Sequence, residues 1–198
     1  WDLYAACRAG RYEEVQRALG ASTGPNVDRE DSAGYTPLML AALHGHENIC
    51  LLLLFNGARV DIQRRRPSCA RPAYCCGALG PPAHLGWTAL HLCAWGGSPE
   101  HARILQYLLR SLRSSAAIED AQGNTPLHLA ALYGSQEVIR LAAADCPARW
   151  FTTRNSAGKL PEDLAQTEEI RVQVQGEASA AAVRSKPPAR AVAAPGGA

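Results

Sequence analysis

A short pattern recurs along this chain, and its recurrence limits the fold more than any other feature. The full copies are GYTPLMLAALHG, GWTALHLCAWGG and GNTPLHLAALYG, at Gly34–Gly45, Gly86–Gly97 and Gly123–Gly134. A weaker copy, GKLPEDLAQ, lies at Gly158–Gln166, and WDLYAACRAG at Trp1–Gly10 matches the later half of the pattern. Apolar helical runs follow the copies, so we expect repeating helix pairs. One pair cannot bury its apolar face alone, so neighbouring pairs must stack into a solenoid.

Residue types at the ends of each copy predict where the first helix of a pair begins and stops. Thr36 and Thr125 are suited to cap a helix N-terminus, and Pro37 and Pro126 follow at the first helical position. Glycines at the C′ position are expected to end these helices, at Gly45, Gly97 and Gly134. Each unit is therefore predicted as helix, short turn, helix and a hairpin-like loop.

The pattern resembles the ankyrin repeat family, whose T-P-L-H-x-A motif returns about every 33 residues. The resemblance covers roughly residues 1–170 and implies an all-α ankyrin-repeat solenoid of about four to five helix-turn-helix repeats with short hairpin-like loops. In that family the motif histidine bonds to neighbouring loops, so His91 and His128 are expected to be structural. Met39 stands in its place in the second repeat, where a weaker network is expected.

The spacing of the copies predicts an insertion. Thr36 and Thr88 are 52 residues apart, which exceeds the period by 19, and removing residues 65–83 restores it. The expected repeats are then 1–30, 31–64, 84–119 and 120–154, followed by a partial, capping repeat at 155–170 with a short polar helix at Leu160–Ile170. Residues 171–198 have little beyond alanine to pack and are predicted to form a disordered tail.

The insertion itself admits several interpretations. Cysteine and histidine ligands for zinc are present at Cys69, Cys75, Cys76 and His84, but their spacing lacks the paired C-x2-C unit of common zinc sites, so we expect no metal. Arg64–Arg66 forms a weak basic cluster that could serve as a nuclear import signal. The simpler interpretations are a disordered, basic, Pro-rich loop or a retained non-coding stretch, and we do not expect the insertion to carry the main function.

Charge and cysteine use narrow the class of protein. Residues 64–85 carry four arginines and no acidic residue, and residues 171–198 carry four basic residues and one acidic residue. The whole chain has a net charge of +2, so the remaining residues have a net charge of −5. We therefore expect no nucleic-acid binding by the folded body. Cysteines in apolar helical contexts, Cys7, Cys50, Cys93 and Cys146, favour a reducing, intracellular setting, cytoplasmic or nuclear.

Two further expectations concern the extent of the chain and membranes. No apolar run approaches the ~20 residues of a membrane span, so no membrane association is expected. The chain begins at Trp1 without a methionine, as expected of a fragment of a longer protein.

The resemblance also implies where a partner would bind. In ankyrin repeats the variable, solvent-facing positions are the second, third, fifth, thirteenth and fourteenth, and partners bind the concave side. Carried onto this chain, the candidate partner-binding residues are Tyr35, Leu43, His44, Trp87, Trp95, Asn124, Leu132 and Tyr133. Tryptophan and tyrosine are enriched in binding hot spots. The alternative is that these aromatic side chains pack against each other or the insertion and stay half-buried.

No catalytic motif is present, since the chain lacks G-x-S-x-G, H-E-x-x-H and a P-loop. The sequence predicts a non-catalytic protein–protein interaction module, acting as an adaptor or scaffold, without cofactor or metal, and monomeric. The alternative is a regulatory inhibitor that masks a partner's active or nucleic-acid-binding surface, since the acidic body suits a basic partner.

Overall fold

The chain is built from stacked helix pairs. The computed structural model describes residues 2–20, 26–64, 86–111, 118–146 and 148–185. The first helices of the pairs are α1 (Leu3–Ala9), α3 (Pro37–Leu43), α5 (Ala89–Gly96) and α7 (Pro126–Tyr133). Their partners are α2 (Tyr12–Leu19), α4 (Glu47–Phe55), α6 (Pro99–Ser111) and α8 (Gln136–Asp145). A short α9 (Arg149–Thr152), the 3-10 helix η2 (Pro161–Leu164) and α10 (Glu168–Ser185) follow.

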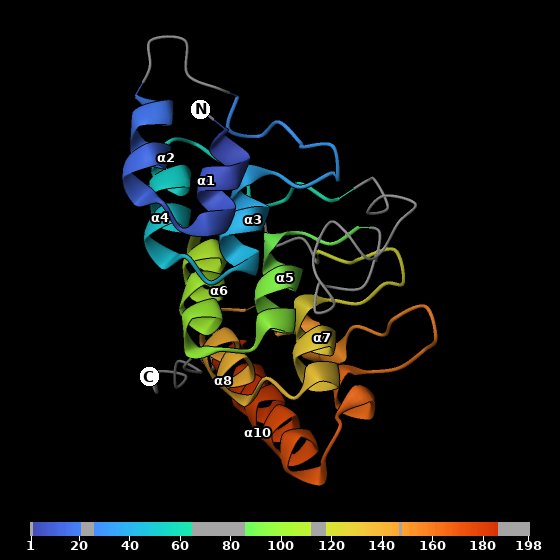
Figure 1. Cartoon of the computed structure of the whole chain (residues 1–198). Helices are drawn as coiled ribbons and strands as arrows, with labels where there is room; N and C mark the ends of the chain where they lie inside the picture. The colour runs from blue at the N-terminus through green and yellow to red at the C-terminus, as the bar shows by residue number, and fades with distance from the viewer. Residues whose placement is uncertain (1, 21–25, 65–85, 112–117, 147, 186–198) are drawn as a thin grey trace, which may run out of the picture.

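The pairs form two layers. The inner helices α1, α3, α5 and α7 pack side by side in one row next to the loops, and α2, α4, α6, α8 and α10 form the outer row (Figure 1). The described residues contain no β-strand. The all-α solenoid predicted from the repeat is confirmed.

The predicted helix boundaries are also confirmed. The Thr36 hydroxyl accepts a hydrogen bond from the Met39 amide at 3.2 Å, and prolines open α3 and α7. Gly97 and Gly134 end α5 and α7 in the left-handed conformation, at φ 68° and 75°. Glycine takes this conformation without the steric cost that a Cβ brings.

Between the layers, alanine and leucine side chains form the core. Ala41 and Ala42 of α3 and Ala130 and Ala131 of α7 are fully buried, which lets the inner helices approach closely. Trp150 and Phe151 of α9 are buried as well. Cys7, Cys50 and Cys93 are buried as free thiols inside the same core, whereas Cys146 is half-buried.

The motif histidines tie consecutive repeats together. Nε2 of His91 lies 3.0 Å from the carbonyl oxygen of Asn124, and Nε2 of His128 lies 3.2 Å from that of Lys159. A carbonyl can only accept, so Nε2 carries the proton, and Nδ1 of His91 accepts from the Thr88 amide at 3.2 Å. Both histidines are therefore structural, as expected.

Each repeat begins with a tight turn, here called the opening turn. In three of these turns the first residue donates its amide hydrogen to the carbonyl of the fifth: Asp31 to Tyr35, Asp120 to Asn124, and Asn155 to Lys159, at 2.9–3.0 Å. In the third repeat the Arg64 amide donates to the Trp87 carbonyl at 2.9 Å, and the Gly86 amide donates to the Arg64 carbonyl at 2.8 Å. Arg64 therefore holds the first position of that turn, and the predicted insertion lies outside the described residues.

The prediction of a disordered tail from residue 171 is wrong for its first part. Residues 168–185 form the helix α10, and the short polar helix expected at Leu160–Ile170 is instead η2 followed by the start of α10. Ile170, Val174 and Ala181 are spaced to share one side of α10, and all three are buried where α10 packs on α8. Alanine-rich sequence thus packs here because a few larger side chains recur at helical spacing. Residues 186–198 lie outside the described residues.

Candidate protein-binding surface

The fifth residue of each opening turn does not lie on an open surface. Tyr35 and Trp87, two of the predicted binding residues, are 4% and 1% exposed. Their prediction as solvent-facing anchors is therefore wrong. The physical reason is that the fifth residue points along the solenoid axis and lies against the first residue of the next opening turn, which covers it.

The contact between the fifth residue of one opening turn and the first residue of the next differs from one pair of repeats to another. Arg64 places its guanidinium carbon 4.3 Å from the centre of the Tyr35 ring and donates from Nε to the Ala33 carbonyl at 3.3 Å. Trp87 donates from its indole Nε1 to the Asp120 carboxylate at 3.2 Å. These two aromatic side chains therefore hold neighbouring repeats together.

Asn124 takes the same place in the fourth repeat. Its side-chain oxygen accepts from Nδ2 of Asn155 at 2.9 Å, and its own Nδ2 donates to Asp120 at 3.2 Å. The residue is half-buried, and both its side-chain oxygen and its side-chain nitrogen bond within the chain. Asn124 thus belongs to the contact between repeats.

The remaining predicted residues lie at the ends of neighbouring inner helices, and this set is here called the helix-end row. It consists of side chains at or just after the C-terminal ends of α3, α5 and α7: Leu43, His44, Trp95, Leu132 and Tyr133. His44 and Tyr133 are exposed, and the others are half-buried. Because α3 packs on α5 and α5 packs on α7, these helix ends follow one another along the inner layer (Figure 1).

Hydrogen bonds from the next repeat fix the ends of α3 and α5, which carry Leu43, His44 and Trp95. Nε2 of His101 donates to the Leu43 carbonyl at 3.1 Å, and the Ser135 hydroxyl donates to the Ala94 carbonyl at 2.9 Å. At the N-terminal end of the solenoid, Nε2 of His46 donates to the Arg8 carbonyl at 3.1 Å. These bonds satisfy carbonyls that the end of a helix leaves without partners, so this part of the row stands on a rigid base.

His44 is neutral on this surface at neutral pH. Partial burial lowers its pKa, and the neighbouring His46, Arg8 and His101 lower it further. Its ring stacks on that of His46, with the ring centres 6.1 Å apart. In the third repeat Gly96 holds the corresponding place, because a Cβ there would overlap the ring of His101.

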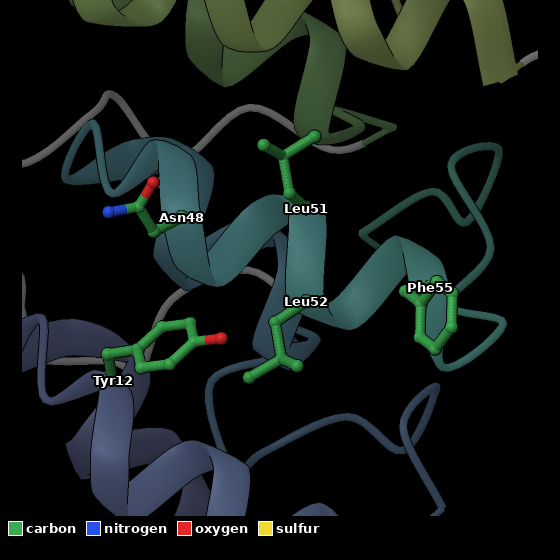
Figure 2. A pocket seen from close by; sticks show the side chains of 5 residues that line it. All are labelled: Tyr12, Asn48, Leu51, Leu52 and Phe55. Atoms are coloured by element: carbon green, nitrogen blue, oxygen red, sulfur yellow. The ribbon is translucent and has the colours of Figure 1, made fainter.

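Sequence reasoning missed a second apolar surface, on the outer layer. Tyr12 of α2 and four residues of α4, namely Asn48, Leu51, Leu52 and Phe55, line an open groove of about 570 Å³. Figure 2 shows these side chains along one side of α4, with Tyr12 facing them from α2. Phe55 is 90% exposed. The signal was available in the run LLLLF, which is apolar all round where an outer helix should alternate with polar residues.

The buried thiols are poorly suited to nucleophilic chemistry. Burial raises the pKa of the Cys7 thiol to about 12 and raises those of Cys50 and Cys93 too, so these thiols are poor nucleophiles. In the part of the chain that the structure describes, no group of three or more histidine, cysteine or acidic side chains is arranged to hold a metal ion. None of its helices is long and apolar enough to cross a bilayer. The cysteines of the insertion lie outside it.

Residues 3–64 and 72–149 match the family of ankyrin repeats in 3 copies. The chain therefore belongs to the ankyrin repeat family, as its T-P-L-H motifs, its two layers of helices and its opening turns indicated. Ankyrin repeats are protein–protein interaction modules, and this defines the class of protein.

Several larger proteins are similar to this chain. E3 ubiquitin-protein ligase XBAT33 of Arabidopsis thaliana is 31% identical over 163 residues, which cover 81% of this chain and 26% of that protein. E3 ubiquitin-protein ligase XBAT32 of the same plant is 30% identical, over 70% of this chain and 35% of that protein. Mouse ankyrin repeat and SAM domain-containing protein 6 is 30% identical, over 73% and 14%. The chain thus spans about a third or less of these relatives.

Proposed function

We propose that this chain is a non-catalytic adaptor that binds a protein partner along the helix-end row. The observation that carries the proposal is that half-buried Leu43, Trp95 and Leu132 and exposed Tyr133 lie at the ends of three neighbouring inner helices. Aromatic side chains on a rigid base bind with little loss of conformational entropy, and they are enriched in binding hot spots.

The row offers a partner two kinds of contact. Trp95 and Leu132 supply half-buried apolar area, and Tyr133 and His44 supply exposed polar groups at the rim. An interface of this composition, with an apolar centre and a polar edge, is typical of protein partners. The body outside residues 64–85 and 171–198 carries a net charge of −5, which disfavours a nucleic-acid backbone as its ligand.

The setting we propose is intracellular, cytoplasmic or nuclear. Free, buried thiols at Cys7, Cys50 and Cys93 support a reducing compartment.

We also propose the repeat boundaries 1–30, 31–64, 84–119 and 120–154, with residues 65–83 inserted in the third opening turn. The backbone hydrogen bonds that join Arg64 to Gly86 and Trp87 support the place of the insertion, and they make Arg64 the first residue of the third turn.

A pull-down from cell lysate, quantified by mass spectrometry, tests the proposal. The double variant Trp95→Ala/Tyr133→Ala is compared with wild type and with Leu51→Ala/Phe55→Ala, a matched control that removes similar apolar area from the outer groove. We expect the row variant to lose specific partners that the control variant retains, with circular dichroism showing both folded. Retention of all partners by the row variant, with their loss from the control variant, would place binding in the groove and overturn the proposal.

A further inference from the structure

The first inner helix, α1, continues the helix-end row with a residue of different chemistry. Arg8 stands two residues before a glycine of positive φ, and so do Leu43, Trp95 and Leu132 at the ends of α3, α5 and α7. The Arg8 side chain is 50% exposed, and α1 lies beside α3 (Figure 1). Along four neighbouring inner helices, the chain therefore places one positive charge and then three apolar side chains.

The electrostatic surroundings of His44, the row residue next to α1, have the same sign as Arg8. Burial lowers the pKa of His44, and the charged groups that shift it further are His46, Arg8 and His101, all of them basic. None of the five residues of the row is acidic. The end of the row at α1 and α3 is therefore basic, although the body as a whole has a net charge of −5.

Acidic side chains near this end are already bound to other groups. Oδ1 of Asp31 accepts from the Tyr35 amide at 2.9 Å, and its Oδ2 lies 3.9 Å from Nη2 of Arg8, which is too far for a hydrogen bond. Glu47 accepts from Nε of Arg103 at 3.0 Å. The Arg8 guanidinium thus keeps donors that a further carboxylate can bind.

The helix ends at this corner are also prepared for an acidic group. The C-terminus of a helix normally repels an anion, because its last carbonyls carry partial negative charge. Here Nε2 of His46 donates to the Arg8 carbonyl, and Nε2 of His101 donates to the Leu43 carbonyl, both at 3.1 Å. These bonds reduce the negative charge beside the Arg8 and His44 side chains.

We propose that the partner binds the helix-end row through an extended segment, with an acidic residue beside Arg8 and His44 and apolar residues along the rest of the row. This inference rests on the proposed function and adds the chemistry of the partner. A carboxylate forms two parallel charge-assisted hydrogen bonds with an arginine, so one acidic residue is enough to set which end of the segment lies at α1. The more distant acids of the body act weakly, because salt screens exposed charges beyond ~10 Å.

The spacing of the inner helices sets the spacing in the segment. Packed helices lie about 8–10 Å apart, and an extended chain advances about 3.3 Å per residue, so about three residues of the segment span one repeat. Apolar residues are therefore expected at intervals of about three from the acidic residue, where they face Leu43, Trp95 and Leu132 in turn. The four helix ends together extend over about 30 Å.

A random dodecapeptide library displayed on phage and selected on the whole chain tests the proposal, since twelve extended residues reach about 40 Å. Selected peptides are labelled with fluorescein, and their dissociation constants are measured by fluorescence polarisation. We call a peptide row-dependent if Trp95→Ala/Tyr133→Ala weakens its binding. Row-dependent peptides should contain aspartate or glutamate, with apolar residues at intervals of about three from it.

Reversing the charge at α1 measures the contribution of the acidic residue. Arg8→Glu should weaken row-dependent peptides by about ten-fold or more, because it sets two like charges together. Replacing the acidic residue of the peptide by lysine should restore binding to Arg8→Glu. Arg140→Glu is the matched control, since Arg140 is 58% exposed on the outer layer and also has one acidic neighbour, Glu137. It should leave the affinities unchanged.

The possible failures of this inference and of the proposed function are distinguishable. Row-dependent peptides that lack an acidic residue, or that bind Arg8→Glu as tightly as wild type, overturn the inference and leave the proposed function standing. A selection without any row-dependent peptide also overturns the extended segment, and the lysate comparison of Trp95→Ala/Tyr133→Ala then tests the row itself. If circular dichroism shows Arg8→Glu unfolded, Arg8→Gln replaces it, with about three-fold weaker binding expected.

Discussion

The third and fourth opening turns have the same backbone hydrogen bonds but side chains of opposite charge at their first position, Arg64 and Asp120. In the fourth, the Asp120 carboxylate accepts from the amides of Gln122 and Asn124 at 2.9 and 2.8 Å, and so supports its own turn. In the third, Arg64 cannot accept, and its side chain extends to the preceding repeat, at the Ala33 carbonyl and the Tyr35 ring. Only the pattern of backbone hydrogen bonds is common to both: Arg64 bonds to Trp87 and Gly86 in the third turn, and Asp120 bonds to Asn124 and Gly123 in the fourth.

This difference shows which part of the turn the fold requires. The backbone hydrogen bonds fix the register between the loop and the following inner helix, and they survive in the third turn although the chain leaves and returns between Arg64 and Gly86. The carboxylate is replaceable, because its place between repeats is taken by an arginine that binds the neighbouring loop. A loop tip with this closed base tolerates extra residues.

The largest expected effect comes from the aromatic residue of the third turn. Trp87→Ala removes a buried indole and leaves Asp120 without its Nε1 donor, so we expect a loss of about 3–5 kcal/mol in the free energy of unfolding. Trp95→Ala, in the half-buried row, should lose less than half as much. Urea denaturation at equal m-value measures both; similar losses in the two variants would contradict the assignment of Trp87 to the core and Trp95 to the surface.

A second prediction uses the histidine that links the third repeat to the fourth turn. Burial lowers the pKa of His91 from 6.5 to about 4 in the folded chain, so the unfolded chain binds a proton first as the pH falls. Its contribution is complete above pH 6.5 and is lost progressively toward pH 4, by up to about 3 kcal/mol. Burial lowers the pKa of His128 in the same direction.

The free energy of unfolding in urea, measured across this pH range, checks the His91 prediction. Acidic side chains also titrate near its lower end, so His91→Gln provides the reference. The wild-type chain should lose more stability than His91→Gln between neutral pH and pH 4. Parallel curves for the two proteins would show that His91 does not carry the effect.

The smallest expected effect comes from making the third turn regular. Deleting residues 65–83 joins Arg64 to His84 and leaves a short closed loop. A shorter loop lowers the entropy cost of closure, so we expect a gain of about 1–2 kcal/mol. Thermal or urea unfolding of the deletion variant measures it. A loss of stability instead would mean that the inserted residues contribute contacts, and that the third turn differs from the fourth in more than length.

The helix-end row shows how far the site could be predicted. Leu43, His44, Trp95, Leu132 and Tyr133 were chosen from the positions that the ankyrin resemblance implies, and the structure places them at the ends of inner helices. Tyr35 and Trp87 were assigned to the same surface by the same rule, yet they are buried. The burial of these two side chains depends on the first residue of the next opening turn, and the position rule takes no account of that residue.

The sequence by itself determined the repeating unit, the beginnings and ends of the inner helices and the linking role of His91 and His128. The helix ends follow from contacts within a few residues, and the role of the two histidines follows from the resemblance to the ankyrin family. Tertiary structure decided the burial of Tyr35 and Trp87, the role of Arg64, the helical form of residues 171–185 and the outer groove at Phe55. Each of these depends on what a neighbouring repeat places against a side chain, and that neighbour is distant in sequence although adjacent in space.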